Sequence, residues 1–291
     1  MTPMIKVLAT DLDGTLFFPK RRTHLIPSRN KNFLRKFVAQ GGKVVLVSSR
    51  GDAFLDRTVK RIGVPIDYIG TDGTLVKIDG KVVREDVFDI EKSKKLIHDL
   101  RRDYDPGMIL MSTRDHPNIM TRTNVSKMTN FFHFLWQMVQ GAYREPFIRS
   151  DNFFYQELNN GNVRKLMILI GITKANQRRA KEITEVLTER YPEFEFMWLN
   201  QFIEITPKGC SKASGLSFYL DYLGINHDNV AVVGDSGNDV PMFKEFYKNS
   251  FCMSHAPEPI RSQACHVIKY VSDLEPVLCP SVDDTPSEKE G

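Results

Sequence analysis

The stretch IKVLATDLDGT at residues 5–15 joins an apolar run to two closely spaced aspartates, Asp11 and Asp13, and a turn. The run predicts a buried strand, so the aspartates lie at its carboxyl end. The stretch KVVLVSSR at 43–50 has the same layout, with polar residues directly after an apolar run. The stretch VAVVGDSGND at 230–239 has it a third time. Nearly continuous apolar runs of this kind are typical of strands covered on both faces in a parallel sheet.

Helix-like segments alternate with these strands, and the alternation predicts an α/β fold. Helices are expected at 28–40, 51–61 and 211–223, and short strands at 68–70, 251–253 and 266–268. Between about Val82 and Ile205 the pattern changes to longer polar loops with more widely spaced elements. Strands are expected there at 108–111, 166–170, 194–198 and 202–205, and helices at 91–104, 125–141 and 174–190.

The change of pattern predicts one domain that is interrupted in sequence by another. Residues 1–83 and 207–280 are expected to form a Rossmann-like core with a parallel sheet, and residues 84–206 an inserted α+β domain. The tail 281–291 is rich in proline, serine and acidic residues and is expected to be disordered.

Composition excludes several classes of protein. The chain has 291 residues, of which 41% are hydrophobic and 26% charged, as is ordinary for a globular protein. No apolar stretch is long enough for a membrane span, and the start of the chain lacks the features of a signal peptide, so a cytoplasmic location is expected. The net charge is only +4, and no basic run with interleaved aromatics suggests a nucleic-acid partner. The four cysteines form no C-x-x-C pair and are interpreted as reduced thiols.

Four aspartates follow two of the predicted strands: Asp11, Asp13, Asp235 and Asp239. Ligands of open parallel sheets bind outside the carboxyl ends of the strands, so these turns are expected to converge. Crowded carboxylates need a cation, and a donor set made only of oxygen favours a hard ion such as Mg²⁺. The alternative is a solvated acidic loop, which we would prefer for either cluster alone.

The motifs resemble those of a known family. DLDGT at 11–15, Ser48 after an apolar strand, Lys212 in the segment KGCSK at 208–212, and GDSGND at 234–239 look like the four motifs of the haloacid dehalogenase (HAD) superfamily. The inserted segment is placed and sized like the C2-type cap of the Cof-type phosphatases. The resemblance covers about residues 4–275 and implies a HAD core with an inserted cap.

The resemblance also implies a role for each matching residue. Asp11 is expected to be the nucleophile that forms an aspartyl-phosphate, and Asp13 the general acid and then the base that activates water. The family's metal, Mg²⁺, would be held by the Asp11 carboxylate, the Asp13 backbone carbonyl and Asp235. Asp239 would act on the metal site by orienting its ligands or a water molecule.

The remaining expected site residues contact the phosphoryl group or the substrate. The resemblance implies that Lys212 offsets the negative charge and that the Ser48 hydroxyl binds a phosphoryl oxygen. Ser49 and Asn238 complete the expected substrate-binding set, although the family usually has glycine where Ser49 stands. Lys208 competes with Lys212 for the lysine role, and it is interpreted as a surface residue.

Several positions stay open at the sequence level. Arg50 either binds an anion or pairs with an acidic side chain. His255 stands where the family commonly has asparagine, and it either contacts substrate or is a structural loop histidine. Asp72-Gly73-Thr74 repeats the DGT motif without the first aspartate, and it is interpreted as a turn with no catalytic role. The direction of three polar side chains in the insert, Arg114, Arg122 and Asn124, cannot be assigned.

The sequence therefore predicts a cytoplasmic, Mg²⁺-dependent phosphomonoester hydrolase. Its partner would be a small phosphate ester, such as a sugar phosphate or a phosphorylated cofactor, with neither nucleic acid nor membrane involved. A phosphotransferase or phosphomutase would carry the same motifs, and a non-catalytic ligand sensor on this fold is a third alternative. The P-loop and the G-x-G-x-x-G motif are absent, which argues against a P-loop kinase and a nicotinamide enzyme. The oligomeric state is left open.

Overall fold

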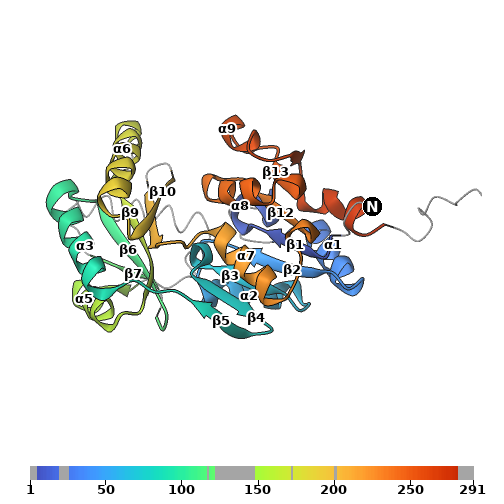
Figure 1. Ribbon diagram of the computed structural model, residues 1–291, viewed down its shortest axis with the longest axis horizontal. Coiled ribbons are helices and arrows are strands. Elements are labelled where there is room, and N and C mark those ends of the chain that lie inside the picture. The colour runs from blue at the N-terminus through green and yellow to red at the C-terminus, as the bar shows by residue number, and fades with distance from the viewer. Residues whose placement is uncertain are drawn as a thin grey trace, which may run out of the picture.

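The structure is a computed structural model that describes residues 5–19, 26–116, 118–121, 148–171, 173–199 and 202–280. The described strands form two separate sheets, one with eight strands and one with six. The sheets lie side by side along the long axis of the molecule, each with its own helices (Figure 1). In sequence, the smaller sheet comes from residues between two parts of the larger one.

The larger sheet has the strand order β14-β13-β12-β1-β2-β3-β4-β5. Its strands are β1 (Val7–Thr10), β2 (Lys43–Val47), β3 (Asp67–Gly70), β4 (Leu75–Ile78), β5 (Lys81–Glu85), β12 (Val230–Gly234), β13 (Ser250–Met253) and β14 (His266–Ile268). All neighbours from β14 to β3 are parallel, in agreement with the sequence prediction. The sheet edge is antiparallel, because the turn η3 (Thr71–Gly73) between β3 and β4 is too short for the crossover that a parallel neighbour needs.

Helices cover both faces of the larger sheet, which explains why its central strands β1, β2 and β12 are largely apolar. They are α1 (Ser28–Ala39), α2 (Asp52–Ile62), α7 (Lys212–Tyr222), α8 (Val240–Glu245), α9 (Glu258–Arg261) and α10 (Glu275–Leu278). Leu8 of β1 packs into a core with α1 and α2, whereas Val7 and Ala9 pack on the opposite face with α7 and α8. Burying each such side chain contributes about 1.5–3 kcal/mol relative to leaving it exposed.

The smaller sheet has the strand order β10-β11-β9-β6-β7-β8. Its strands are β6 (Met108–Thr113), β7 (Ile119–Met120), β8 (Ile148–Arg149), β9 (Val163–Leu169), β10 (Phe194–Leu199) and β11 (Phe202–Pro207), and its helices are α3 (Ile90–Tyr104), α5 (Asp151–Asn160) and α6 (Lys174–Arg190). The helices lie on one face of this sheet, where Leu96, Phe154 and Ile183 share a core with strand residues such as Ile168. Side chains of Asp89, Ser150 and Thr173 cap the three helices.

The other face of the smaller sheet carries both apolar and charged side chains. Strand residues alternate between faces, so Lys165, Met167 and Leu169 of β9 share the face opposite the helices. Glu204 of β11 pairs with Met167 and therefore lies on the same face. Lys165 and Glu204 are 4% and 7% exposed, so this face buries ionisable groups as well as apolar ones.

The structure confirms the α/β core and most of the expected elements, with differences at the least periodic segments. α5 and the two-residue strands β7 and β8 are not among the expected elements. β5 continues the larger sheet to Glu85, past residue 83, where the core was expected to break off. The expected helix at 125–141 and the expected disordered tail at 281–291 lie outside the described residues. Among the described helices, none combines the length and the apolar character that crossing a bilayer requires.

Gly73 lies where the turn η3 meets the start of α7. Its φ is +94°, and a Cβ placed on it would lie 2.0 Å from the backbone oxygen of Ser211. We expect G73A to destabilise the protein by about 3 kcal/mol, because both the backbone conformation and the close contact must change. Urea unfolding checks this. The matched control is G80A, which has a φ of +75° but nothing within 4 Å of the added Cβ, and equal losses in both variants would contradict the close-contact argument.

Candidate active site

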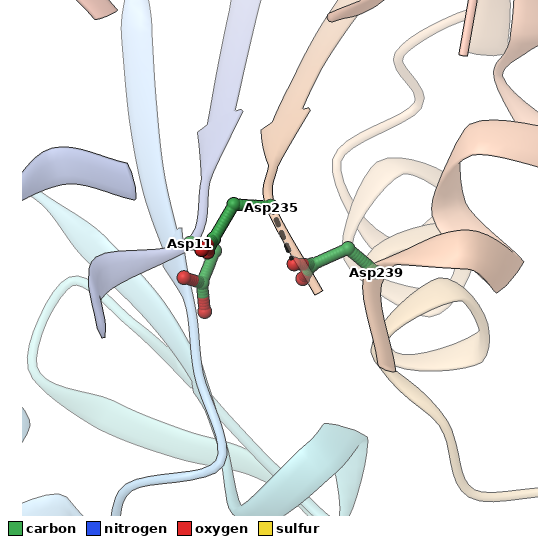
Figure 2. Close-up of side chains that lie close together, drawn as sticks. All are labelled: Asp11, Asp235 and Asp239. Carbon is green, nitrogen blue, oxygen red and sulfur yellow. Dashed lines mark hydrogen bonds between the residues drawn. The ribbon is translucent and has the colours of Figure 1, made fainter. Parts of the chain in front are cut away.

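The two aspartate-containing turns meet at the carboxyl ends of β1 and β12. These strands pair in parallel with Thr10 opposite Val233, and the amide of Asp11 donates to the carbonyl of Val233 at 2.9 Å. Figure 2 shows Asp11 and Asp235 at the ends of the adjacent strands, with Asp239 reaching back toward them from the following turn. Parallel pairing therefore brings together side chains that are far apart in the sequence.

Asp11, Asp235 and Asp239 form a compact carboxylate cluster. One oxygen of each lies within 4.8 Å of the others, and the side chains are buried. Asp239 accepts hydrogen bonds from the amides of Asp235 and Ser236 at 2.9 and 3.0 Å, which fixes its orientation. A cluster of buried oxygen donors fits a hard divalent cation such as Mg²⁺. Asp13 contributes no carboxylate to this cluster, so its expected share in metal binding through the backbone carbonyl stays a prediction.

Lys212 supplies a positive charge to the same cluster. It is the first residue of α7, directly after the capping residue Ser211, and its side chain is 1% exposed. Its Nζ lies 2.7 Å from Asp11 Oδ1 and 2.6 Å from Asp239 Oδ1. Burial lowers the pKa of Lys212, but the two carboxylates more than reverse this effect and hold the pKa well above its usual value.

One lysine does not balance three buried carboxylates. Burial raises the pKa of Asp11 well above its usual value; Lys212 opposes the shift, whereas Asp239 and Asp235 add to it. A second cation in the cluster would favour the ionised form of Asp11. The electrostatics of the cluster thus agree with the cation that its oxygen donors suggest.

The Asp13 carboxylate pairs with Arg50, which lies in the turn that follows β2. The carboxylate is 39% exposed and lies 2.8 Å from Arg50 Nε, with a second contact of 3.2 Å to Arg50 Nη2. This two-point contact fixes the position of the carboxylate. Arg50 therefore pairs with an acidic side chain that is itself one of the expected catalytic residues.

The residues that follow β2 adjoin the turn that follows β12. Ser48 is 2% exposed, and its Oγ accepts a hydrogen bond from the amide of Arg50 at 3.2 Å. Ser49 Oγ accepts from Asn238 Nδ2 at 2.8 Å and donates to Asp72 Oδ1 at 3.1 Å. Ser48, Ser49 and Asn238 therefore lie at the same edge of the sheet as the carboxylate cluster, as the sequence suggests.

Asp72 borders this site, although the sequence indicates there only a turn with no catalytic role. The turn itself is confirmed, but Asp72 is 6% exposed and contacts Ser49, Asn238 and the cation of Lys165. It lines a cavity of about 300 Å³ together with Lys212, Asn238 and residues of β10 and β11. The cavity therefore lies between the two sheets and shares Lys212 with the carboxylate cluster.

Lys165 and Glu204 were missed by sequence reasoning. Lys165 Nζ lies 2.5 Å from Glu204 Oε1 and also contacts Asp72. A signal was available for Glu204, which interrupts the run FIEI at 202–205, whereas Arg164 and Lys165 precede the strand expected at 166–170. Charged residues in a buried strand need partners, but the sequence does not say which ones.

Glu204 gives the stability of the protein a specific pH dependence. Burial and the charge of Asp72 raise its pKa to about 7, with Lys165 opposing. The unfolded carboxyl ionises near its ordinary value of 4.5, so this contribution to stability is present below pH 4.5 and is lost as the pH rises through 7. We expect E204Q to be about 1–3 kcal/mol more stable than the unmodified protein at pH 8, and the gain to shrink at pH 5.

Urea unfolding at the two pH values measures this difference. The matched control is E195Q, whose carboxylate is 40% exposed on the neighbouring strand β10, and we expect it to change stability by less than about 0.5 kcal/mol. A gain from E204Q that is the same at pH 5 and pH 8 would show that burial does not raise the pKa of Glu204.

Two further side chains hold Asp235. Thr15 Oγ1 donates to Asp235 Oδ1 at 3.1 Å, and His255 Nε2 lies 3.3 Å from Asp235 Oδ2. The His255 ring also stacks on Phe18, with 4.2 Å between the ring centroids. Gly14 is needed beside them, because a Cβ there would lie 2.3 Å from Asp235 Oδ2. Thr15 was not selected from the sequence, although it belongs to the DLDGT motif.

Of the four remaining candidates, the structure describes two. Lys208 is 59% exposed and pairs with Glu195 at 3.0 Å, as a surface residue. Arg114 pairs with Glu85 at 2.5 Å at the border between the two sheets. Arg122 and Asn124 lie outside the described residues.

Comparison with known proteins identifies the family. A family model described as haloacid dehalogenase-like hydrolase matches residues 8–278. The chain belongs to the haloacid dehalogenase-like hydrolase family. Membership confirms the resemblance inferred from the motifs, the α/β core with an inserted domain, and the interpretation as an enzyme.

Individual HAD relatives are distant. The chain is 25% identical to the pyridoxal phosphate phosphatase YbhA of Escherichia coli over 268 residues, which are 90% of this chain and 93% of the relative. It is 22% identical to the chloroplastic endoribonuclease YBEY of Arabidopsis thaliana over 83% of the chain but spans only 40% of that protein. The structure of a haloacid dehalogenase-like hydrolase from B. subtilis superimposes with a TM-score of 0.74 at 20% identity, covering 94% of this chain and 98% of that one.

Proposed function

We propose that this HAD hydrolase is a Mg²⁺-dependent phosphomonoester hydrolase that acts through an aspartyl-phosphate intermediate. The observation that carries the proposal is the buried cluster of Asp11, Asp235 and Asp239 with Lys212 in contact with two of them. The cluster places a candidate nucleophile beside a fixed positive charge, which phosphoryl transfer needs. Mg²⁺, held by the carboxylates of Asp11 and Asp235 and the Asp13 carbonyl, would supply further positive charge to the phosphate oxygens.

Each residue then has a defined task in the reaction. A carboxylate oxygen of Asp11 attacks phosphorus and forms an acyl phosphate, while the bond from phosphorus to the ester oxygen breaks. Asp13 donates a proton to the leaving oxygen and then accepts one from the water that hydrolyses the intermediate. Arg50 holds the Asp13 carboxylate at 2.8 Å, and Asp239 keeps Lys212 in place at 2.6 Å. The Ser48 hydroxyl would bind a phosphoryl oxygen.

The substrate is proposed to be a small phosphorylated metabolite. The cavity of about 300 Å³ between the two sheets offers room for a compact leaving group next to the proposed phosphate position. A relative named as a pyridoxal phosphate phosphatase supports a phosphorylated cofactor, and a structural neighbour named as a sugar phosphatase supports a sugar phosphate. We propose that residues 84–206 act as the cap that selects the substrate, that 1–83 and 207–280 form the catalytic core, and that the enzyme works in the cytoplasm.

Hydrolysis of p-nitrophenyl phosphate tests the proposal. We expect turnover with Mg²⁺ and its loss when EDTA removes the metal, with recovery on adding Mg²⁺ back. Turnover that is unaffected by EDTA would contradict the metal dependence. Faster release of nitrophenol than of inorganic phosphate when a sugar is added would instead reveal a phosphotransferase, because a sugar hydroxyl would then accept the phosphoryl group.

A further inference from the structure

Two consecutive cations of β9 bridge the two layers of the molecule. Arg164 and Lys165 are 3% and 4% exposed, although both are charged residues in a strand of apolar neighbours. Arg164 Nε lies 2.7 Å from Glu85, the last residue of β5 in the larger sheet. Lys165 contacts Asp72, which follows β3 of the same sheet. Each cation and its carboxylate belong to different layers, so both pairs form only when the smaller sheet is seated on the larger one. Without these pairs the buried charges would be costly.

The Lys165 contact continues into the proposed phosphate site. Asp72 Oδ2 accepts a hydrogen bond from Lys165 Nζ. Asp72 Oδ1 accepts hydrogen bonds from Ser49 Oγ at 3.1 Å and from Asn238 Nδ2 at 3.2 Å. Asn238 also donates to Ser49 at 2.8 Å and accepts from Ser236 Oγ at 2.6 Å. One carboxylate thus joins the cap-side lysine to the turns that follow β2 and β12.

The backbone around Asp72 ties the same turns together. Its φ of 54° places a residue other than glycine in the left-handed region, and Thr71 before it has a φ of 46°. The amide of Asp72 donates to the carbonyl of Ser48 at 3.2 Å, and that of Thr71 to the carbonyl of Arg50 at 3.0 Å. Such conformations persist only where surrounding contacts hold them, and Lys165 supplies a contact of this kind from the other layer.

The neighbouring Arg164 pair is a natural comparison. Arg164 is as buried as Lys165 and also joins the two layers, through Glu85 and, at 3.4 Å, Asp52. Among the hydrogen bonds of the described residues, neither of these carboxylates contacts Ser49 or Asn238. The two cations therefore differ in their connection to the phosphate site and not in their burial.

We propose that Lys165 is a positioning residue that couples seating of the smaller sheet to assembly of the phosphate site. The inference rests on the proposed hydrolase function, and it states that a residue of the smaller sheet regulates the geometry of the phosphate site. With the sheet seated, Lys165 holds Asp72, and Asp72 orients Ser49 and Asn238. When the sheet moves away, Lys165 leaves with it, and water replaces the lysine at Asp72, so the two side chains lose their fixed orientation. Catalytic geometry is then complete only in the closed state.

The test compares K165M with R164M in the full-length protein. Both variants remove a buried interlayer ion pair, and K165M also removes the partner of Glu204 in its own sheet, so thermal unfolding measures how far each is destabilised. With p-nitrophenyl phosphate and Mg²⁺, we expect K165M to lower kcat/KM by about 30-fold and to weaken inhibition by inorganic phosphate by about 10-fold. R164M is expected to leave phosphate inhibition within about two-fold of the unmodified enzyme. Equal effects of the two variants on phosphate inhibition would overturn the proposal.

A second variant keeps the lysine and removes the carboxylate charge. D72N is nearly the same size as the original residue, so it serves even where K165M does not fold. We expect it to weaken phosphate inhibition to a similar extent. The double variant K165M/D72N is expected to lose no more phosphate affinity than the single variant with the larger loss, because both substitutions interrupt one connection. Independent losses that multiply in the double variant would show that Lys165 does not act through Asp72.

Failure of this inference can be told apart from failure of the proposed function. If the unmodified protein hydrolyses no phosphate ester with Mg²⁺, the proposed function is wrong. Binding of inorganic phosphate, measured by calorimetry with Mg²⁺, then replaces the kinetic readout for the same variants. A phosphate affinity that K165M and D72N leave unchanged would overturn the role of Lys165 whether or not hydrolysis is observed.

Discussion

Replacing Asp11 by asparagine is expected to lower the rate of p-nitrophenyl phosphate hydrolysis by about 10⁴-fold or more while leaving the protein folded. The amide has the shape of the carboxylate but lacks the negatively charged oxygen that would attack phosphorus. Asp11 is 4% exposed, so a smaller replacement such as alanine would also leave a cavity. Steady-state kinetics with Mg²⁺ measure the loss directly.

Stability separates this effect from simple unfolding. Asp11 lies in a cluster of three buried carboxylates that share one lysine, and its pKa is raised because burial disfavours the charge. D11N removes one of these charges, so we expect a Tm in EDTA that is equal to or higher than that of the unmodified protein. The matched control is D221N on α7, where the carboxylate is 73% exposed, and it should change neither property. A D11N enzyme that keeps more than a hundredth of the activity would exclude Asp11 as the nucleophile.

The parts of the fold that the sequence predicts are those where burial leaves a strong pattern. β1, β2 and β12 are covered on both faces, so their apolar runs are continuous and their ends are marked by polar turns. The edge pair β4 and β5 is antiparallel, and the smaller sheet contains two-residue strands whose length carries no periodicity. Those elements are set by what packs against them, which the sequence does not display.

The residues of the candidate site likewise fall into two groups, those that the sequence predicts and those that only the structure shows. Asp11 and Asp235 could be selected because each follows a predicted strand, and Lys212 because its segment resembles a motif of the HAD superfamily. Asp72 could not, because its importance comes from Lys165, which lies 93 positions away in the other layer. The pairing of Arg50 with Asp13 joins residues 37 positions apart, which the sequence alone does not show. Local pattern thus identifies the residues at strand ends, whereas contacts between layers need the three-dimensional arrangement.

Replacing Lys212 by methionine is expected to reduce both activity and stability strongly. The ammonium group is 1% exposed and lies 2.7 and 2.6 Å from the carboxylates of Asp11 and Asp239, which lose their counter-charge in K212M. Removing one partner of a buried ion pair costs about 3 kcal/mol or more, and loss of the charge on the phosphoryl group lowers kcat by about 10³-fold. K208M is the matched control, because Lys208 is 59% exposed and should tolerate the change.

The two losses in K212M can be separated by a second substitution. In K212M/D239N one of the two uncompensated carboxylates is gone, so we expect most of the stability to return while the activity stays low. The destabilisation of K212M should also shrink as the pH falls toward about 4, because burial holds the pKa of Asp11 well above its usual value and K212M removes the charge that opposes this shift, so that the carboxyl takes up a proton. Urea unfolding between pH 3.5 and 7.5 measures this, and kinetics follow activity. If K212M/D239N regained activity together with stability, Lys212 would serve only to balance the charge of Asp239, and its contact with the phosphoryl group would be excluded.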